Sequence, residues 1–282
     1  VCRAFMDYSK VIYVKKGVYK EKLILPSWLT NITICGEDRD NTIITWDDHA
    51  NIKMPTGGLD SEAAVKGKPM GTFRTYTLKV QGSYITLKNI TIENNAAKLG
   101  QAVSLHLEGD HILVQNCRLL GNQDTVYTGI ANNRSAFYDC YIEGTTDFIF
   151  GPGRAWFENC EIRSKPNSYI TAASSPAGQE YGYVFNKCKL TAEPGIDKVY
   201  LGRPWRPYAA TLFMNCEMGS HIRPEGWHNW GKHSNEQTAR YSEYNNHGSG
   251  AATKARVAWS RQLTKKEAAK VTIKNVFGEE AL

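Results

Sequence analysis

The chain has 282 residues, of which 41% are hydrophobic and 22% are charged, and 34 basic against 28 acidic side chains give a net charge of +6. This composition is typical of a folded globular protein and excludes an intrinsically disordered chain. No run of about 18 apolar residues is present, so no membrane span is predicted. The small, scattered basic excess predicts no nucleic-acid partner.

Short segments of alternating apolar residues open the chain. Residues 11–26 contain two strand-like runs, VIYV and LILP, around a predicted turn at residues 17–19. The segments NITICG (31–36) and NTIITW (41–46) predict two further strands. Residues 51–71 are polar and rich in glycine, which predicts a long loop.

A repeat dominates residues 77–218, and the rest of the chain lacks a period. Residues 227–250 are rich in aromatic, His and Asn residues, which favours loops packed along one side of the molecule. Residues 264–276 begin with TKKE and contain good helix formers, so a C-terminal helix is predicted there. Since no break in composition divides the chain, residues 1–282 are predicted to form one domain.

The repeat is marked by cysteines in one shared context. An aromatic residue or valine lies three positions before each cysteine, and Leu, Ile or Met follows two positions after it, at Cys117, Cys140, Cys160, Cys188 and Cys216. Ile90 occupies the same place in a sixth copy, and the intervals from it are 27, 23, 20, 28 and 28 residues. Repeats of this length indicate stacked units, and the alternation within each copy predicts a short strand. Stacked strand-rich coils form an all-β parallel β-helix.

Like residues of successive coils lie above one another in such a fold, about 4.8 Å apart. The cysteines are therefore predicted to form a buried column of small apolar groups. The alternative, one or two disulfides among them, stays open.

Charged and amide side chains interrupt the strand pattern at corresponding places. Gln101 and Asp124 each lie 16 residues before the cysteine that follows them, while Asp147 and Arg203 each lie 13 before theirs. Gln101, the pair Gln123–Asp124, and Asp147 are therefore predicted to lie close together on successive coils.

Two neighbouring carboxyl groups cannot both ionise freely, so the pKa of one should rise. One acid can then donate a proton while the other carboxylate attacks or accepts one. Glutamine N–H groups can bind a developing oxyanion, and a guanidinium can hold a carboxylate through two hydrogen bonds. Trp205 offers an apolar face on which a sugar can lie. For any single residue, a turn cap or an outer polar ladder remains the alternative.

Five motifs, taken together, resemble those of the pectin methylesterases (pectinesterases). They are GVYKE (17–21), QAV (101–103), QDTVY (123–127), DFIFG (147–151) and LGRPW (201–205). Their order and approximate spacing agree over residues 11–276. The resemblance implies a right-handed parallel β-helix that hydrolyses the methyl esters of galacturonate units in pectin, releasing methanol and pectate. It implies no metal and no organic cofactor.

The resemblance also implies roles for individual residues. Asp147 is the expected nucleophile, and Asp124 the group that protonates the leaving methanol and then takes a proton from water. Gln123 and Gln101 are expected to stabilise the oxyanion, and Arg203 to orient Asp147. The residues expected to bind the substrate are Thr72, Gln101, Tyr127, Phe150, Arg203 and Trp205.

Two structural questions follow from these assignments. Asp147 and Arg203 lie two repeats apart, about 9.6 Å if the coils are regular, so residues 171–183 are expected to be offset or looped out. Trp227 and Trp230 fit either an extension of the cleft or packing of the loops.

The seven histidines show no metal-ligand spacing, which predicts no metal site.

Other functions stay open at this point. A β-helix lyase or glycoside hydrolase would cut the same polymer, a pectin-binding β-helix would lack catalysis, and a relative of the family would act on another ester or thioester. A pectin substrate predicts a secreted, extracellular or periplasmic protein, and we expect a monomer.

Overall fold

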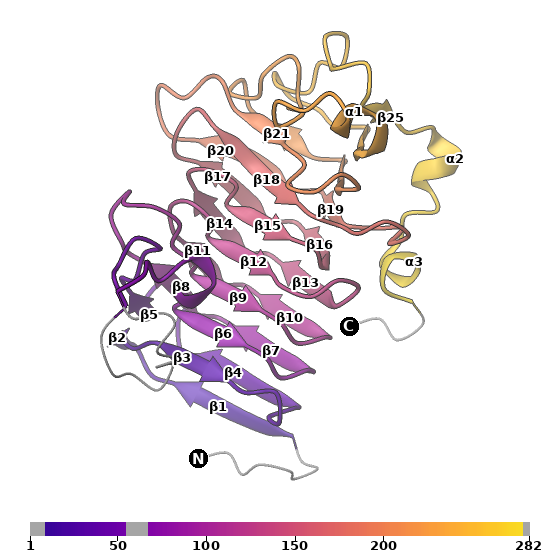
Figure 1. The fold of residues 1–282 in the computed structure, drawn as a ribbon. Helices are drawn as coiled ribbons and strands as arrows, with labels where there is room; N and C mark the ends of the chain where they lie inside the picture. Colours follow the sequence, from indigo (N-terminus) through magenta and orange to yellow (C-terminus); the bar gives the residue numbers. More distant parts are fainter. Residues whose placement is uncertain (1–8, 55–66, 279–282) are drawn as a thin grey trace.

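The computed structural model describes residues 9–54 and 67–278, which wind into a right-handed parallel β-helix of three sheets (Figure 1). Sheet A has ten strands, in the spatial order β1 (Lys10–Val14), β4 (Ile32–Gly36), β7 (Ile85–Lys88), β10 (Ile112–Gln115), β13 (Arg134–Tyr138), β16 (Arg154–Glu158), β19 (Tyr183–Asn186), β22 (Ala210–Met214), β24 (Arg240–Tyr244) and β25 (Arg261–Gln262). Sheet B has eight, β2 (Gly17–Lys20), β5 (Thr42–Trp46), β8 (Thr91–Asn94), β11 (Arg118–Leu120), β14 (Tyr141–Gly144), β17 (Glu161–Ser164), β20 (Lys189–Ala192) and β23 (Glu217–Met218). Sheet C has seven, β3 (Leu23–Leu25), β6 (Leu78–Val80), β9 (Leu105–Leu107), β12 (Val126–Thr128), β15 (Ile149–Gly151), β18 (Tyr169–Ala173) and β21 (Tyr200–Gly202).

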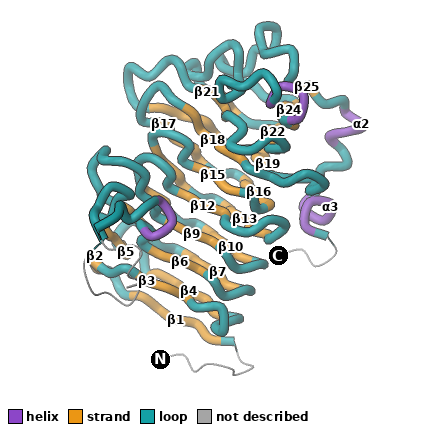
Figure 2. The backbone as a smooth tube through the Cα atoms, viewed as in Figure 1, coloured by secondary structure: helices purple, strands orange, loops and turns teal. Residues whose placement is uncertain are grey.

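One coil consists of an A, a B and a C strand in succession, and each strand pairs in parallel with its counterpart in the next coil. Long loops project beside β5 and at the C-terminal end of the stack (Figure 2). The short helices are η2 (Thr72–Arg74), α1 (Asn235–Thr238), α2 (Lys265–Ala268) and α3 (Ile273–Phe277).

The cysteine motif is a corner between two sheets, so the prediction of one strand through each copy is wrong. In the third copy, Phe157 belongs to β16 and Ile162 to β17, and Asn159 between them has a φ of 55°. Asparagine accepts this left-handed conformation more readily than most residues. Asn116 of an earlier copy turns the same corner and donates to the side chain of Asn89 at 2.9 Å.

The cysteines form the predicted buried column. Cys117, Cys140, Cys160, Cys188 and Cys216 are buried and free of disulfides. Backbone hydrogen bonds link successive coils, since the N–H of the residue after each of the last four cysteines donates to the cysteine carbonyl one coil below, as Tyr141 does to Cys117 at 2.9 Å. Cys35 is also a free thiol, and Cys2 lies outside the described residues.

A second interior ladder consists of aromatic rings. Phe137, Phe157, Phe185 and Phe213 stack in successive coils with ring centres 4.6, 4.3 and 4.3 Å apart. The core therefore repeats side chains of the same shape at each level, which keeps the strands of each sheet in register.

Two of the predicted loop segments contain strands. Residues 17–19 lie in β2 rather than in a turn, because they pair with β5. Residues 227–250 include β24, which continues sheet A beside β22. The expected strands at 31–36 and 41–46 are confirmed as β4 and β5. Of the predicted loop at 51–71, residues 55–66 lie outside the described residues.

The expected C-terminal helix is two short helices. Thr264 begins α2 with a capping box that includes Glu267. Thr272 then begins α3 by accepting a hydrogen bond from the N–H of Asn275, so the chain changes direction between the two. The contact with the stack is confirmed, since Val276 and Phe277 pack in one cluster with Trp156 of sheet A. Within the described residues, no helix is long and apolar enough to cross a membrane.

Candidate active site

Two aspartates stand side by side at the start of adjacent sheet C strands. Val126 of β12 pairs with Ile149 of β15, and Asp124 and Asp147 each lie two residues before these partners. Both have left-handed backbones, with φ of 68° and 52°, a conformation outside the extended range of a β-strand. They are only 8% and 5% exposed.

Backbone hydrogen bonds hold this corner in place. The N–H of Asp124 donates to the carbonyl of Thr146 at 3.1 Å, and that of Asp147 donates to the carbonyl of Tyr169 at 2.9 Å. The two carboxyl groups are thus fixed on successive coils by the sheet itself.

The surroundings of the two acids shift their pKa values by different amounts. Burial raises the pKa of Asp124 well above its usual range, and the neighbouring charge of Asp147 raises this pKa further. Burial also raises the pKa of Asp147, but hydrogen bonds and positive charge from Arg203 oppose that rise. Asp147 is therefore the acid that ionises first, and Asp124 the acid that retains its proton.

Arg203 binds both oxygens of Asp147. Its Nε donates to Oδ1 at 2.9 Å and its Nη2 to Oδ2 at 2.7 Å. The expectation that residues 171–183 are offset or looped out is wrong for Thr171–Ala173, which belong to β18, a regular strand that pairs with both β15 and β21. Residues 174–182 do form a loop, between β18 and β19. The arginine side chain spans β18.

The small residue Ala172 of β18 lies beside Arg203. Ala172 pairs with Phe150, and Thr171 pairs with Gly202, so Arg203 lies beside Ala172 on the next coil. Alanine has only a methyl side chain, so it adds little bulk beside Arg203.

Two aromatic rings flank the guanidinium. The carbon Cζ of Arg203 is 4.0 Å from the ring centre of Tyr169 and 3.8 Å from that of Trp230. Trp230 thus lies at the site, whereas Trp227 is buried in the core and stacks on Tyr241 at 4.2 Å. Tyr169 was not among the sequence candidates, since a tyrosine in a strand gives no signal of its own.

A row of aromatic side chains continues from the acids along sheet C. Ring centres are 4.9 Å apart between Phe73 and Tyr127, 4.6 Å between Tyr127 and Phe150, and 5.9 Å between Phe150 and Trp205. Thr72 precedes Phe73 in η2. Phe73, which is 44% exposed, was missed from the sequence because it lies in a loop outside the repeat.

The two glutamines lie on the other side of the acids. Gln123 immediately precedes Asp124, and its carbonyl accepts a hydrogen bond from the N–H of Ala102 at 3.0 Å. Gln101 is therefore on the neighbouring coil, and both glutamine side chains are half-buried. Their amide groups can donate hydrogen bonds to an oxygen held above the acids.

A cavity of about 270 Å³ opens beside this end of the site. Its lining includes Gln123 and also Thr146, the residue before Asp147, and the remaining residues are Lys98, Gly100, Asn122, Thr145 and Pro166.

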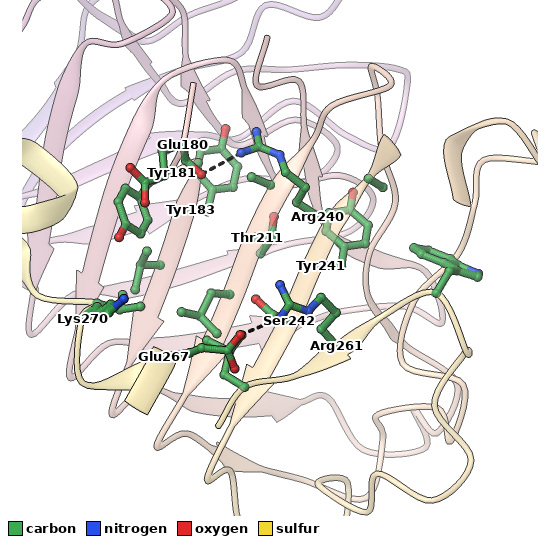
Figure 3. A pocket seen from close by; sticks show the side chains of 18 residues that line it. Glu180, Tyr181, Tyr183, Thr211, Arg240, Tyr241, Ser242, Arg261, Glu267 and Lys270 are labelled. Carbon is green, nitrogen blue, oxygen red and sulfur yellow. Dashed lines mark hydrogen bonds and ion pairs between the residues drawn. The ribbon is translucent and has the colours of Figure 1, made fainter. Parts of the chain in front are cut away.

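A larger cavity of about 420 Å³ lies on the outer face of sheet A, between β19, β22, β24 and α2 (Figure 3). The ion pair of Arg261 and Glu267 stands at its edge. It is separate from the two aspartates, which lie on sheet C. In the described residues, no group of three or more His, Cys, Asp or Glu side chains is arranged to hold a metal ion.

Comparisons with known proteins agree over nearly the whole chain. The family model described as pectinesterase matches residues 4–280. Pectinesterase 31 of Arabidopsis thaliana is 37% identical over 260 residues, which cover 92% of this chain and 80% of the relative. The solved pectin methylesterase from carrot has a TM-score of 0.87 and 30% identity, and the match covers 99% of this chain and 87% of that one. A pectin methylesterase solved in complex with a hexasaccharide has a TM-score of 0.81 at 29% identity, covering 98% of this chain and 90% of that one.

Proposed function

The chain belongs to the pectinesterase family, and we propose that it hydrolyses the methyl esters of pectin through a covalent bond between Asp147 and the substrate. The observation that carries this proposal is the pair of buried acids, of which Arg203 holds only Asp147 through two hydrogen bonds. This arrangement supplies one carboxylate and one protonated carboxyl group on adjacent coils.

In the first step, an oxygen of Asp147 attacks the carbonyl carbon of the methyl ester. The carbonyl oxygen becomes an oxyanion, to which the amide groups of Gln123 and Gln101 donate hydrogen bonds. Asp124 gives its proton to the methoxy oxygen, so the bond to methanol breaks and an acyl anhydride on Asp147 remains. The raised pKa of Asp124 is what keeps this proton available at neutral pH.

In the second step, the ionised Asp124 takes a proton from a water molecule as that water attacks the acyl carbon. The bond to Asp147 breaks, and the product leaves with a new carboxylic acid group, which forms pectate when it ionises. Asp147 returns to its anionic form, which the guanidinium of Arg203 stabilises at both oxygens. Both acids are then in their starting protonation states once the pectate proton is released to solvent.

The aromatic row gives the cleft its affinity for sugar rings. Tyr127, Phe150 and Trp205 present apolar faces next to the acids, and Thr72 and Arg203 add polar contacts. We place pectin, methylated along its galacturonate units, in this cleft. Because the polymer is extracellular and one chain holds all the proposed groups, we propose a secreted, extracellular or periplasmic monomer.

The test measures methanol and polymer length together, with methylated pectin as the substrate. We expect the wild-type protein to release methanol without shortening the polymer. Shortening without methanol would point to a lyase or glycoside hydrolase, and binding without either product would point to a pectin-binding β-helix. Methanol release from a different ester but not from pectin would indicate a relative with another substrate.

A further inference from the structure

We propose that Tyr169 and Trp230 are positioning residues, whose rings hold the guanidinium of Arg203 in the plane required for its two hydrogen bonds to Asp147. This inference rests on the proposed function, because it assumes that an ionised Asp147 is the attacking group. Neither ring needs to touch the reacting atoms for this role.

The geometry shows why Arg203 needs support. A bidentate arginine–carboxylate pair requires the two planar groups to be aligned. Arg203 makes this pair from two coils away, so its long, flexible side chain must stay extended across β18. The ring centres 4.0 and 3.8 Å from its Cζ restrict that motion by contact with the face of the cation.

Tyr169 contacts both members of the pair. Its carbonyl accepts the hydrogen bond from the N–H of Asp147 at 2.9 Å, while its ring lies under Arg203. Tyr200 of the next coil stacks on the same ring, with centres 5.3 Å apart and planes 12° from parallel. The ring is therefore fixed by its own neighbour and gives Arg203 a rigid surface.

Trp230 is held in an unfavourable backbone conformation. Its φ is 61°, which is rare for a bulky side chain. The N–H of Trp230 donates to Nδ1 of His228 at 3.0 Å, and the N–H of Gly231 donates to Oδ1 of Asn229 at 2.8 Å. The ring of His228 in turn packs 5.4 Å from that of Tyr169. Strain maintained by several contacts at a cleft is typical of a functional position.

The test compares loss of the ring with loss of the hydroxyl alone. In Tyr169→Leu we expect kcat to fall about three- to thirtyfold, the range that one cation–π contact represents. Tyr169→Phe keeps the ring and should retain nearly all of the activity. Trp230→Leu and Trp230→Phe should follow the same pattern, and they supply the test if Tyr169→Leu does not fold.

The pH profile separates positioning from a general structural effect. Arg203 opposes the rise in the pKa of Asp147, so a poorly held guanidinium lets this pKa rise further. The acid limb of kcat should therefore move to higher pH in both Leu variants and stay in place in both Phe variants. Tyr141→Leu is the matched control, since it removes a tyrosine 5.7 Å from Arg118 on sheet B, away from the cleft, and should leave the limb unchanged.

Two results would overturn the inference. One is equal impairment of the Leu and Phe variants, and the other is an unmoved acid limb in both Leu variants. Failure of the proposed function is recognised separately: an active Asp147→Asn variant would reject the nucleophile whatever the Tyr169 variants do.

Discussion

Arg203 and Asp147 are joined across an intervening coil. The guanidinium binds both carboxylate oxygens, at 2.9 and 2.7 Å. Asp147 precedes β15 and Arg203 follows β21, and β18 lies between these two strands in sheet C. The side chain of Arg203 therefore crosses β18, and Ala172 of this strand lies beside Arg203.

A larger side chain at Ala172 should break this contact. Ala172 is only 2% exposed, so the added bulk of Ala172→Leu has no free space to enter and displaces Arg203. We expect kcat to fall by about tenfold or more, measured as methanol release from methylated pectin. Ala172→Gly introduces no bulk and serves as the control; equal activity of the Leu variant and the wild type would contradict this account of the crossing.

The pH dependence should be bell-shaped. Asp147 must be ionised to attack, and its pKa is raised, so kcat should fall as the pH drops through a value above the usual range of aspartate. Asp124 must be protonated in the first step, and its pKa is raised more strongly, so an alkaline limb should appear where it ionises. An acid limb absent down to about pH 3 would argue against Asp147 as the nucleophile.

Asp124 should also lower the stability of the fold. Its pKa is higher in the folded than in the unfolded chain, so between these two pKa values folding takes up a proton, and stability falls as the pH rises from the unfolded pKa through the folded one. Asp124→Asn removes this effect, and asparagine accepts the left-handed backbone at this position. At pH 7 we expect Tm to rise by about 2–6 °C while turnover is lost.

The comparison at low pH checks that prediction. Below the ordinary pKa of aspartate, Asp124 is protonated in both states and the variant should gain little. A gain in Tm that is the same at pH 3.5 and at pH 7 would show that ionisation is not its cause.

Gln101 should act on rate more than on binding. If its amide donates to the oxyanion, Gln101→Ala should lower kcat by about 10²–10³. Kinetics on methylated pectin measure this directly. A variant whose KM rises while kcat is unchanged would assign Gln101 to substrate binding alone.

The repeat could be predicted from the sequence because coils that pack in the same way carry similar residues at equivalent positions. The spacing of the cysteine motifs predicted the coil length. The number of residues from each aspartate to the next cysteine then placed Asp124 and Asp147 on successive coils. The corner at Asn159 was missed, since alternation of apolar residues does not reveal a single positive φ. The sequence predicted wrongly that the strand between Arg203 and Asp147 is displaced. That the small residue Ala172 lies beside Arg203 can be seen only once the register of the strands is known.

The supporting residues gave weaker signals. Tyr169 looks like an ordinary strand residue, and Phe73 lies in a loop outside any repeat. Trp230 and Trp227 share one aromatic segment, but one flanks Arg203 and the other fills the core. The tryptophan that contacts Arg203, Trp230, has a positive φ, which the sequence alone does not reveal.

The central claim, a covalent bond to Asp147, can be measured by trapping. The enzyme would be mixed with a short methylated galacturonate oligomer, quenched with hydroxylamine, digested and examined by mass spectrometry. Asp139→Asn is the matched control, because Asp139 also has a left-handed backbone, with φ of 54°, but lies at a corner between sheets A and B. We expect modification of the peptide that contains Asp147 in the wild type and in Asp139→Asn, and none in Asp147→Asn. Methanol release by Asp147→Asn at the wild-type rate, or modification of a different acid, would contradict the account.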